Sequence, residues 1–210
     1  MLRSKYQKDG RHVVSIALGR VKILLRRLAS KWLLGWDVAT MGAGAYVRGA
    51  RHIEMGRNFR CRSNLWIEAV TRYGEHDHAP RIVIGDNFSC GDGVHIAAIN
   101  AVAIGNDVLV GSNVLITDHS HGCYDGQDQS DPEVAPGDRM LVSKGPVTIG
   151  NKVFIGDNVC VLAGTDVGRG AIVAANSVVT RDVPVNTIVA GNPAKPIKRF
   201  CETSRRWVKI

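Results

Sequence analysis

A six-residue spacing of aliphatic residues is the feature of this sequence that most restricts the fold it can adopt. The regular series in the C-terminal half is Ile149, Ile155, Val161, Val167, Val173 and Val179. This period matches neither the turn of an α-helix, at about 3.6 residues, nor the two-residue alternation of an exposed strand. It predicts a coil of triangular cross-section with about 18 residues per turn, in which each side supplies one inward-pointing aliphatic residue.

The coil also accounts for the small residues that follow many aliphatic positions. Gly150, Gly156 and Gly168 come directly after members of the series, where the chain must turn a crowded corner. Because no single coil can bury its own interior, the coils must stack and pair their strands in parallel. The composition, with 23 Gly and only four each of Phe, Trp and Tyr, favours this all-β architecture over a helical bundle.

Two segments interrupt the repeat. The polar segment 71–80 predicts a short loop that leaves the coil. After Ile116 the series stops at D-H-S-H, positions 118–121, and resumes near Val147, so segment 117–146 is expected to be excluded from the coil. A rigid frame that ends at two histidines and then releases a polar loop is typical of a functional site.

The basic character of the chain is confined to its N-terminal segment. Residues 1–36 hold nine Lys or Arg against Asp9 alone, whereas the remaining charges balance at 18 of each sign. The body has no basic patch with interleaved aromatic residues, which argues against a nucleic-acid partner. No signal peptide is evident, and the apolar-leaning run 13–36 carries too many charges to be a good membrane span.

Residues 12–36 have the spacing of an amphipathic helix. Its apolar stripe is Val14, Leu18, Val21, Leu25, Leu28 and Trp32. With basic residues beside the stripe, one interpretation is a peripheral contact with an anionic membrane surface. The other interpretation is a helix packed against the body or a neighbouring subunit.

The five cysteines are an odd number without a C-x-x-C motif. Cys90 and Cys160 are expected to fall on apolar positions of the repeat, which predicts reduced, buried thiols and a cytoplasmic protein.

The two histidines at the break could serve three purposes. Zinc binding is disfavoured, because there is no second compact pair of ligands and the alternating spacing directs the two rings apart. A structural role is possible for both. The third role is that of a general base, since an imidazole titrates near neutral pH and can take a proton from an attacking hydroxyl. Asp118 is a candidate for fixing the other ring nitrogen, while His76, His78 and His95 are expected to be structural.

The aliphatic-then-small pattern over roughly residues 40–190 resembles the hexapeptide-repeat acyltransferases, which form a left-handed parallel β-helix. The D-H-x-H-G version is similar to the branch that acetylates sugars of polysaccharide and lipopolysaccharide. A gapless count from Gly105 and Gly111 places that family's catalytic histidine at His121, with His119 as its neighbour. Asn100, where the spacing slips by two residues, and Asp118 are then the expected substrate-binding residues.

The same resemblance implies a site for acetyl-CoA as co-substrate, with no metal. A-A-N-S-V-V-T-R-D-V-P at 174–184 is similar to the segment that contacts the pantetheine arm, and G-N-P-A-K-P-I-K at 191–198 matches the terminal phosphate-binding element. The expected cofactor-binding residues are Gly156, Ala175, Thr180, Arg181, Lys195 and Lys198. Without a Ser or Cys in a nucleophile context, direct transfer is expected rather than an acyl-enzyme.

These observations predict an all-β protein in three parts: a helical segment at 1–36, a left-handed β-helix at 37–190, and a cofactor-binding turn and tail at 191–210. The resemblance implies transfer of an acetyl group to a hydroxyl of a sugar or lipid-linked glycan by a homotrimer. The expected location is the cytoplasm, or the inner face of the membrane. Two alternatives stay open. One is N-acetylation of an amino sugar or amino acid, and the other is a non-catalytic β-helix scaffold.

Overall fold

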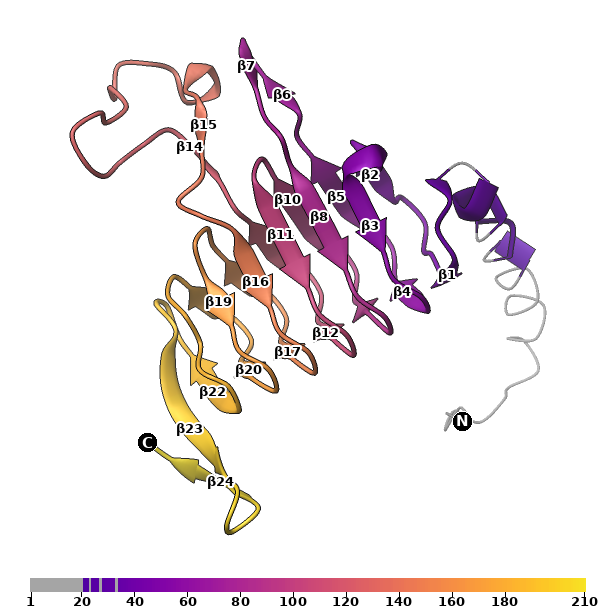
Figure 1. The fold of residues 1–210 in the computed structure, drawn as a ribbon, viewed down its shortest axis with the longest axis vertical. Coiled ribbons are helices and arrows are strands. Elements are labelled where there is room, and N and C mark those ends of the chain that lie inside the picture. Colours follow the sequence, from indigo (N-terminus) through magenta and orange to yellow (C-terminus); the bar gives the residue numbers. More distant parts are fainter. Residues whose placement is uncertain (1–20, 23, 27, 33) are drawn as a thin grey trace, which may run out of the picture.

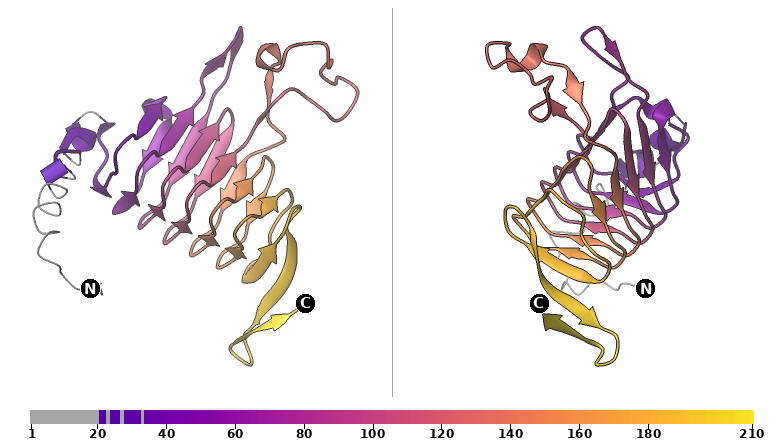
Figure 2. Two further views of the ribbon diagram at one scale, coloured as in Figure 1. Left: turned by 180° about the vertical axis from the view of Figure 1, so that it is seen from behind. Right: turned by 60° about the vertical axis from the view of Figure 1, so that its left-hand side comes forward.

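The chain winds into a triangular prism with a β-sheet on each of its three faces, in which the strands of successive coils pair in parallel (Figure 1). The computed structural model describes residues 21–210 except 23, 27 and 33. We call the nine-stranded, six-stranded and five-stranded sheets the first, second and third faces. Each coil passes through the three faces in that order, and the N-terminal helical segment and the C-terminal hairpin lie at opposite ends of the prism (Figure 2).

The first face consists of β1 (Val38–Thr40), β4 (Phe59–Cys61), β9 (Ser89–Cys90), β12 (Leu109–Val110), β17 (Phe154–Ile155), β20 (Ile172–Val173), β22 (Thr187–Ala190), β23 (Lys195–Cys201) and β24 (Arg206–Lys209). The second face consists of β2 (Tyr46–Arg48), β5 (Trp66–Ala69), β10 (His95–Ala98), β13 (Leu115–Thr117), β18 (Cys160–Val161) and β21 (Val178–Val179). The third face consists of β3 (Ile53–Met55), β8 (Arg81–Ile84), β11 (Ala101–Ile104), β16 (Val147–Ile149) and β19 (Asp166–Val167). A short 3-10 turn, η1 (Ala50–His52), precedes β3.

The aliphatic series of the sequence forms the interior of the prism, which confirms the register predicted from its period. All six members from Ile149 to Val179 are at most 1% exposed. They stack from coil to coil, as where Ile155 pairs with Val110 on one side and Val173 on the other. The core is therefore a column of branched aliphatic side chains that only neighbouring coils cover.

The corners are as crowded as the small residues suggested. A Cβ placed on Gly156 would lie 2.6 Å from the backbone nitrogen of Ala175 in the next coil, closer than real Cβ contacts. Asparagines take the left-handed backbone conformation beside such positions, as Asn113, Asn158 and Asn176 do with φ near 60°. Their amides form a ladder along the corner, because Asn113 donates to Asn158 and Asn158 donates to Asn176.

Coils that contain an interruption of the repeat are longer than the ideal length of about 18 residues. Hydrogen-bonded corner residues of successive coils are 29, 20, 45 and 18 residues apart. Only the last spacing is the ideal one. The 29-residue coil contains segment 71–80, the 20-residue coil contains the slip at Asn100, and the 45-residue coil contains the segment after β13.

Both interruptions leave the prism on the same side (Figure 1). Segment 71–80, expected as a loop, forms a hairpin of β6 (Arg72–Tyr73) and β7 (His76–Asp77). The longer segment leaves through β14 (Ser120–His121) and returns through β15 (Leu141–Val142), an antiparallel pair, with a 3-10 turn η2 (Pro136–Asp138) in between.

The cysteines only partly follow the expectation of buried thiols. All five are free; Cys61 and Cys90 are buried, and burial raises the pKa of both thiols above the ordinary range. Cys160 departs from the expectation because it precedes the inward-pointing Val161 and therefore faces outward, half-buried. Cys201 differs again, since hydrogen bonding from Ser204 lowers the pKa of its thiol.

The two ends of the chain also differ from expectation in part. The described residues of 21–34 are helical, whereas the predicted helix from 12 to 20 lies outside the described residues. The predicted tail at 191–210 is not a separate turn and tail, because it forms an antiparallel hairpin of β23 and β24 that extends the first face. In the described part of the chain, no helix combines the length and the apolar character needed to cross a bilayer.

Stacking predicts a sharp difference between two neighbouring residues of β17. Ile155 points inward and is fully buried, whereas Phe154 points outward and is 42% exposed. Ile155→Asp should lower the free energy of unfolding by more than about 4 kcal/mol, because it buries an unpaired carboxylate. Phe154→Asp, the matched control, should change it by less than about 1 kcal/mol. Denaturant unfolding measures both, and equal effects would contradict the register.

Candidate active site

Two edges of the prism carry the residues of interest. We call the edge at which strands of the second face end the second corner; Asn100, His119 and Thr180 lie on it. We call the edge at which strands of the first face end the first corner; Ala175 and Gly191 lie on it. The second face separates the two corners.

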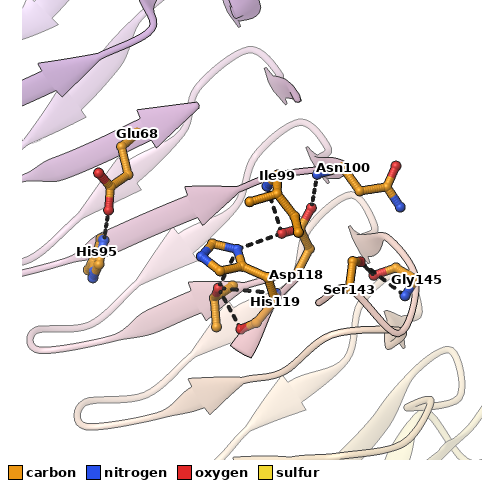
Figure 3. A network of polar contacts seen from close by, with 9 residues as sticks. Glu68, His95, Ile99, Asn100, Asp118, His119, Ser143 and Gly145 are labelled. Carbon is orange, nitrogen blue, oxygen red and sulfur yellow. Dashed lines mark hydrogen bonds and ion pairs between the residues drawn. The ribbon is translucent and has the colours of Figure 1, made fainter. Parts of the chain in front are cut away.

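Asp118 is buried below the second corner and holds the backbone and the His119 ring there in place. Its side chain is fully buried, and its two carboxylate oxygens accept the backbone N–H groups of Ile99 and Asn100 at 3.0 and 2.8 Å (Figure 3). The first of these oxygens also lies 2.8 Å from His119 Nδ1. Because its oxygens are occupied in this way, Asp118 positions its neighbours and has no surface for the expected contact with a substrate.

His119 is held in one orientation by this carboxylate. Its side chain is 12% exposed, and Thr117 Oγ1 lies 3.3 Å from the same Nδ1 atom. In a neutral ring whose Nδ1 proton is directed to Asp118, Nε2 carries no proton, and among the described residues no hydrogen bond to Nε2 is formed. The ring lines a pocket of about 290 Å³ that also contains Lys144, Leu162 and Thr180.

His121 lies two residues further on, on the strand pair that leads into the long loop. Its ring is exposed and packs edge-on against Tyr73 of the β6–β7 hairpin, with ring centroids 5.2 Å apart. The Tyr73 hydroxyl donates to the Gly137 carbonyl at 2.6 Å, so its oxygen is left to accept from His121 Nδ1 at 3.3 Å. This arrangement also leaves Nε2 of His121 as the basic nitrogen.

Asn100 is exposed at the same corner. Its backbone N–H is used by Asp118, and its side-chain amide points away from that carboxylate (Figure 3). The structure therefore brings four sequence-predicted residues together: Asn100, Asp118, His119 and His121.

The expected cofactor-binding residues do not gather in one place. Thr180 and Arg181 lie at the second corner, whereas Ala175 lies at the first corner, on the other side of β21. Five extended residues span about 16 Å, so Ala175 and Thr180 flank the second face at its two edges. One corner of one chain cannot present both sets.

Gly156, another expected cofactor-binding residue, lies at the first corner, where β17 ends. It is buried between coils, and its N–H donates to the Val173 carbonyl at 2.8 Å. The next residue, Asp157, is exposed, and its carboxylate accepts the Ser112 N–H at 2.7 Å. That bond turns the Asp157 charge toward the backbone of the preceding coil.

The terminal turn is fixed to the first corner. Gly191 accepts from the Val178 N–H at 3.0 Å, its own N–H donates to Ser177 Oγ at 3.1 Å, and the Ala194 N–H donates to the Val178 carbonyl at 2.8 Å. Lys195 follows this turn and is exposed, while Lys198 is half-buried further along β23.

Several residues of the site gave no signal in the sequence. Tyr73 belongs to a segment whose sequence is typical of an ordinary polar loop. Its contact with His121 joins residues 48 positions apart in the sequence, so no local pattern indicates it. Lys144 pairs with Asp125 across the long loop, and hydrogen bonding to that carboxylate raises the Lys144 pKa. Among the described residues, no group of three or more His, Cys, Asp or Glu is arranged to hold a metal ion.

Comparison with known proteins gives this geometry a context. Residues 146–181 match the model of the hexapeptide repeat of succinyl-transferase. The chain is 42% identical over 165 residues to the Escherichia coli K12 protein WbbJ, which is named for O-acetyl transfer in lipopolysaccharide biosynthesis; the match covers 78% of this chain and 80% of WbbJ. The chain belongs to the hexapeptide-repeat acetyltransferases.

Two solved structures show the same fold. AntD from Bacillus cereus, an N-acyltransferase in complex with dTDP and 3-hydroxybutyryl-CoA, has a TM-score of 0.61 at 15% identity, over 80% of this chain and 82% of AntD. A hexapeptide-repeat acetyltransferase from Vibrio cholerae, in complex with acetyl-CoA, has a TM-score of 0.51 at 24% identity, over 93% and 94% of the two chains. This hexapeptide-repeat acetyltransferase is thus a left-handed parallel β-helix, and acetyl-CoA is its co-substrate.

The buried carboxylate predicts an effect on folding at the second corner. Asp118→Asn replaces an oxygen acceptor with an amide donor opposite backbone N–H groups, and it should lower the free energy of unfolding by about 2–4 kcal/mol. Asp92→Asn is the matched control, because Asp92 also accepts a backbone N–H but is 43% exposed. It should cost less than about 1 kcal/mol, and equal losses in denaturant unfolding would contradict this role for Asp118.

Proposed function

We propose that this acetyltransferase moves the acetyl group of acetyl-CoA to a hydroxyl of a sugar in the biosynthesis of cell-surface polysaccharide or lipopolysaccharide. The observation that carries the proposal is the arrangement of two oriented imidazoles at the second corner: His119 lines a pocket, and His121 lies at the start of the polar loop that leaves the coil. The similarity to WbbJ supports O-acetylation of a glycan as the class of reaction.

His121 is the proposed general base. Its ring is exposed between the β6–β7 hairpin and the long loop, where a bulky glycan can approach, and Tyr73 fixes its Nδ1. Nε2 takes the proton of the sugar hydroxyl while the oxygen attacks the thioester carbonyl. The C–O bond forms, the C–S bond breaks, and the proton passes from His121 to the sulfur of CoA. A backbone N–H at the corner is the proposed donor to the oxyanion.

His119 is the second candidate for the base, because a buried carboxylate orients its ring. That geometry is a frequent arrangement of catalytic imidazoles. Its ring faces the pocket shared with Thr180, on the side proposed for the thioester, and is largely covered. In our proposal the Asp118–His119 pair therefore shapes the donor side, and Asn100 contacts the acceptor.

We also propose a homotrimer, in which the first corner of one copy faces the second corner of the next. This arrangement unites the two separated sets of cofactor-binding residues in one groove. It places the second faces around the three-fold axis. The outward residues along that face are mostly apolar or aromatic, as a subunit interface requires. In register they are Tyr46, Trp66, His95, Leu115, Cys160 and Val178.

A lipid-linked glycan acceptor would place the enzyme in the cytoplasm at the inner face of the membrane. N-acylation of an amino sugar is the alternative reaction, supported by the shared fold of AntD. The same base and groove would serve it, because only the attacking atom changes.

The experiment that tests the function is release of free CoA thiol from acetyl-CoA against a panel of sugars. The wild-type protein should release thiol only with a hydroxyl-bearing sugar acceptor. His121→Ala should lower kcat by roughly 10²–10⁴-fold with little change in KM, and His119→Ala by a smaller factor. The reverse order would transfer the role of base to the carboxylate-bound His119, and no thiol release with any sugar would overturn the proposed function.

The shared groove predicts complementation between two inactive variants. His121→Ala damages the second corner, and Ala175→Trp blocks the first. With equal co-expression and random assembly, about a quarter of all grooves, or one groove in each mixed trimer, combine an intact second corner with an intact first corner. Activity should return to about that fraction of wild type. Folded, trimeric mixtures that stay inactive would contradict a groove formed by two copies.

A further inference from the structure

The N-terminal helix presents its apolar side to solvent, the reverse of a helix that docks on its own domain. Five apolar side chains of the helix are between 54% and 86% exposed. They are Val21, Leu24, Leu25, Leu28 and Trp32. At about 100° per residue, these positions fall within an arc of about 100° on the helix surface.

The opposite side of the helix packs against the prism. Ser30 is buried, Arg26 is half-buried, and Leu34 packs against the core. Together with Ala29 they line a pocket of about 350 Å³ against the first coil, near Met41. The exposed arc therefore faces away from the protein, and in the described residues nothing of the same chain covers it.

Basic residues border this arc. Lys22 and Lys31 are exposed and lie outside the arc on the helix surface, one on each side of it. Long basic side chains at such positions can extend their ammonium groups to lipid phosphates while the apolar residues enter the acyl boundary. Trp32, the most exposed of the five at 86%, has the amphipathic ring that favours this boundary.

Charge decides between the two occupants that an apolar face could have. Residues 1–36 carry nine basic residues and one acidic residue. A second copy of this segment would bring like charges together, whereas an anionic bilayer would neutralise them. We propose that the exposed face of this helix binds the surface of an anionic membrane.

The position of the helix fits this role. It lies beyond β1 at the N-terminal end of the prism (Figures 1 and 2). In the proposed trimer, with its axis along the prism, three helices would share one end and could contact one flat surface together. Such multivalent contact strengthens binding without new contacts in any one copy. The avidity depends on the proposed trimer, but the membrane contact does not.

Vesicle flotation of the full chain tests the proposal. The wild type should float with phosphatidylcholine vesicles that contain phosphatidylglycerol, much less with phosphatidylcholine alone, and less at high salt. The triple variant Leu25→Ser, Leu28→Ser, Trp32→Ser should lose at least about tenfold in binding, because the apolar area of the face is removed. Lys22→Glu with Lys31→Glu should lose binding to the anionic vesicles.

Matched controls lie far from the helix. Arg206→Glu with Lys209→Glu makes the same change of charge on the exposed strand β24, and Leu109→Ser with Val185→Ser removes exposed apolar groups elsewhere. Both controls should float like the wild type. Thiol release with a soluble sugar should be unchanged in the triple serine variant, so failure of the membrane proposal is distinguishable from failure of the proposed function.

Three results would overturn the proposal. One is a wild type that does not float with anionic vesicles. The second is flotation that the helix variants leave unchanged. The third is a combined result: the wild type does not bind vesicles, and the triple serine variant loses the native oligomer in light scattering. The exposed face of the helix would then be an interface between copies of the chain.

Discussion

Each coil of this protein is covered only by the coils before and after it, and the rest of the molecule depends on that contact. The aliphatic column from Ile149 to Val179 has no other source of burial. The stacking also fixes the corners at a separation that allows no side chain at Gly156. A frame of this kind tolerates insertions only where the chain can leave and return at one corner, which is where both excursions emerge.

The candidate site follows from this constraint. Where the coil is interrupted after β13, backbone N–H groups of the preceding coil at Ile99 and Asn100 would lose their partners, and Asp118 supplies them. The same carboxylate also orients His119. A single buried side chain therefore both satisfies the backbone N–H groups at the break and fixes the imidazole at the second corner. His121 is placed by a different contact, from Tyr73 of the other excursion.

The sequence allowed the prism, its inward register and the position of the break to be predicted, because a six-residue period directly specifies which side chains point inward. It did not predict the outward direction of Cys160, since one residue of register separates a core position from the surface. The burial of Asp118 and the contact of Tyr73 depend on distant backbone groups. The hairpin of β23 and β24 was missed because its pairing partner, β22, belongs to the coil.

The spacing of apolar residues in the N-terminal helix does not reveal which way its apolar side faces. Periodicity identified its apolar side, but only the packing of Ser30 and Leu34 against the prism showed that this side faces outward. The direction of an amphipathic helix relative to its own domain is a tertiary property, which the spacing of apolar residues in the sequence does not specify.

The central claim is that an acetyl group passes from acetyl-CoA to a sugar hydroxyl at the second corner. The most direct measurement is the mass and alkali lability of the product formed from acetyl-CoA and a sugar that carries both hydroxyl and amino groups. The account predicts one added acetyl group that mild alkali removes, as expected for an ester. An added acetyl group that resists alkali, as an amide does, would contradict it.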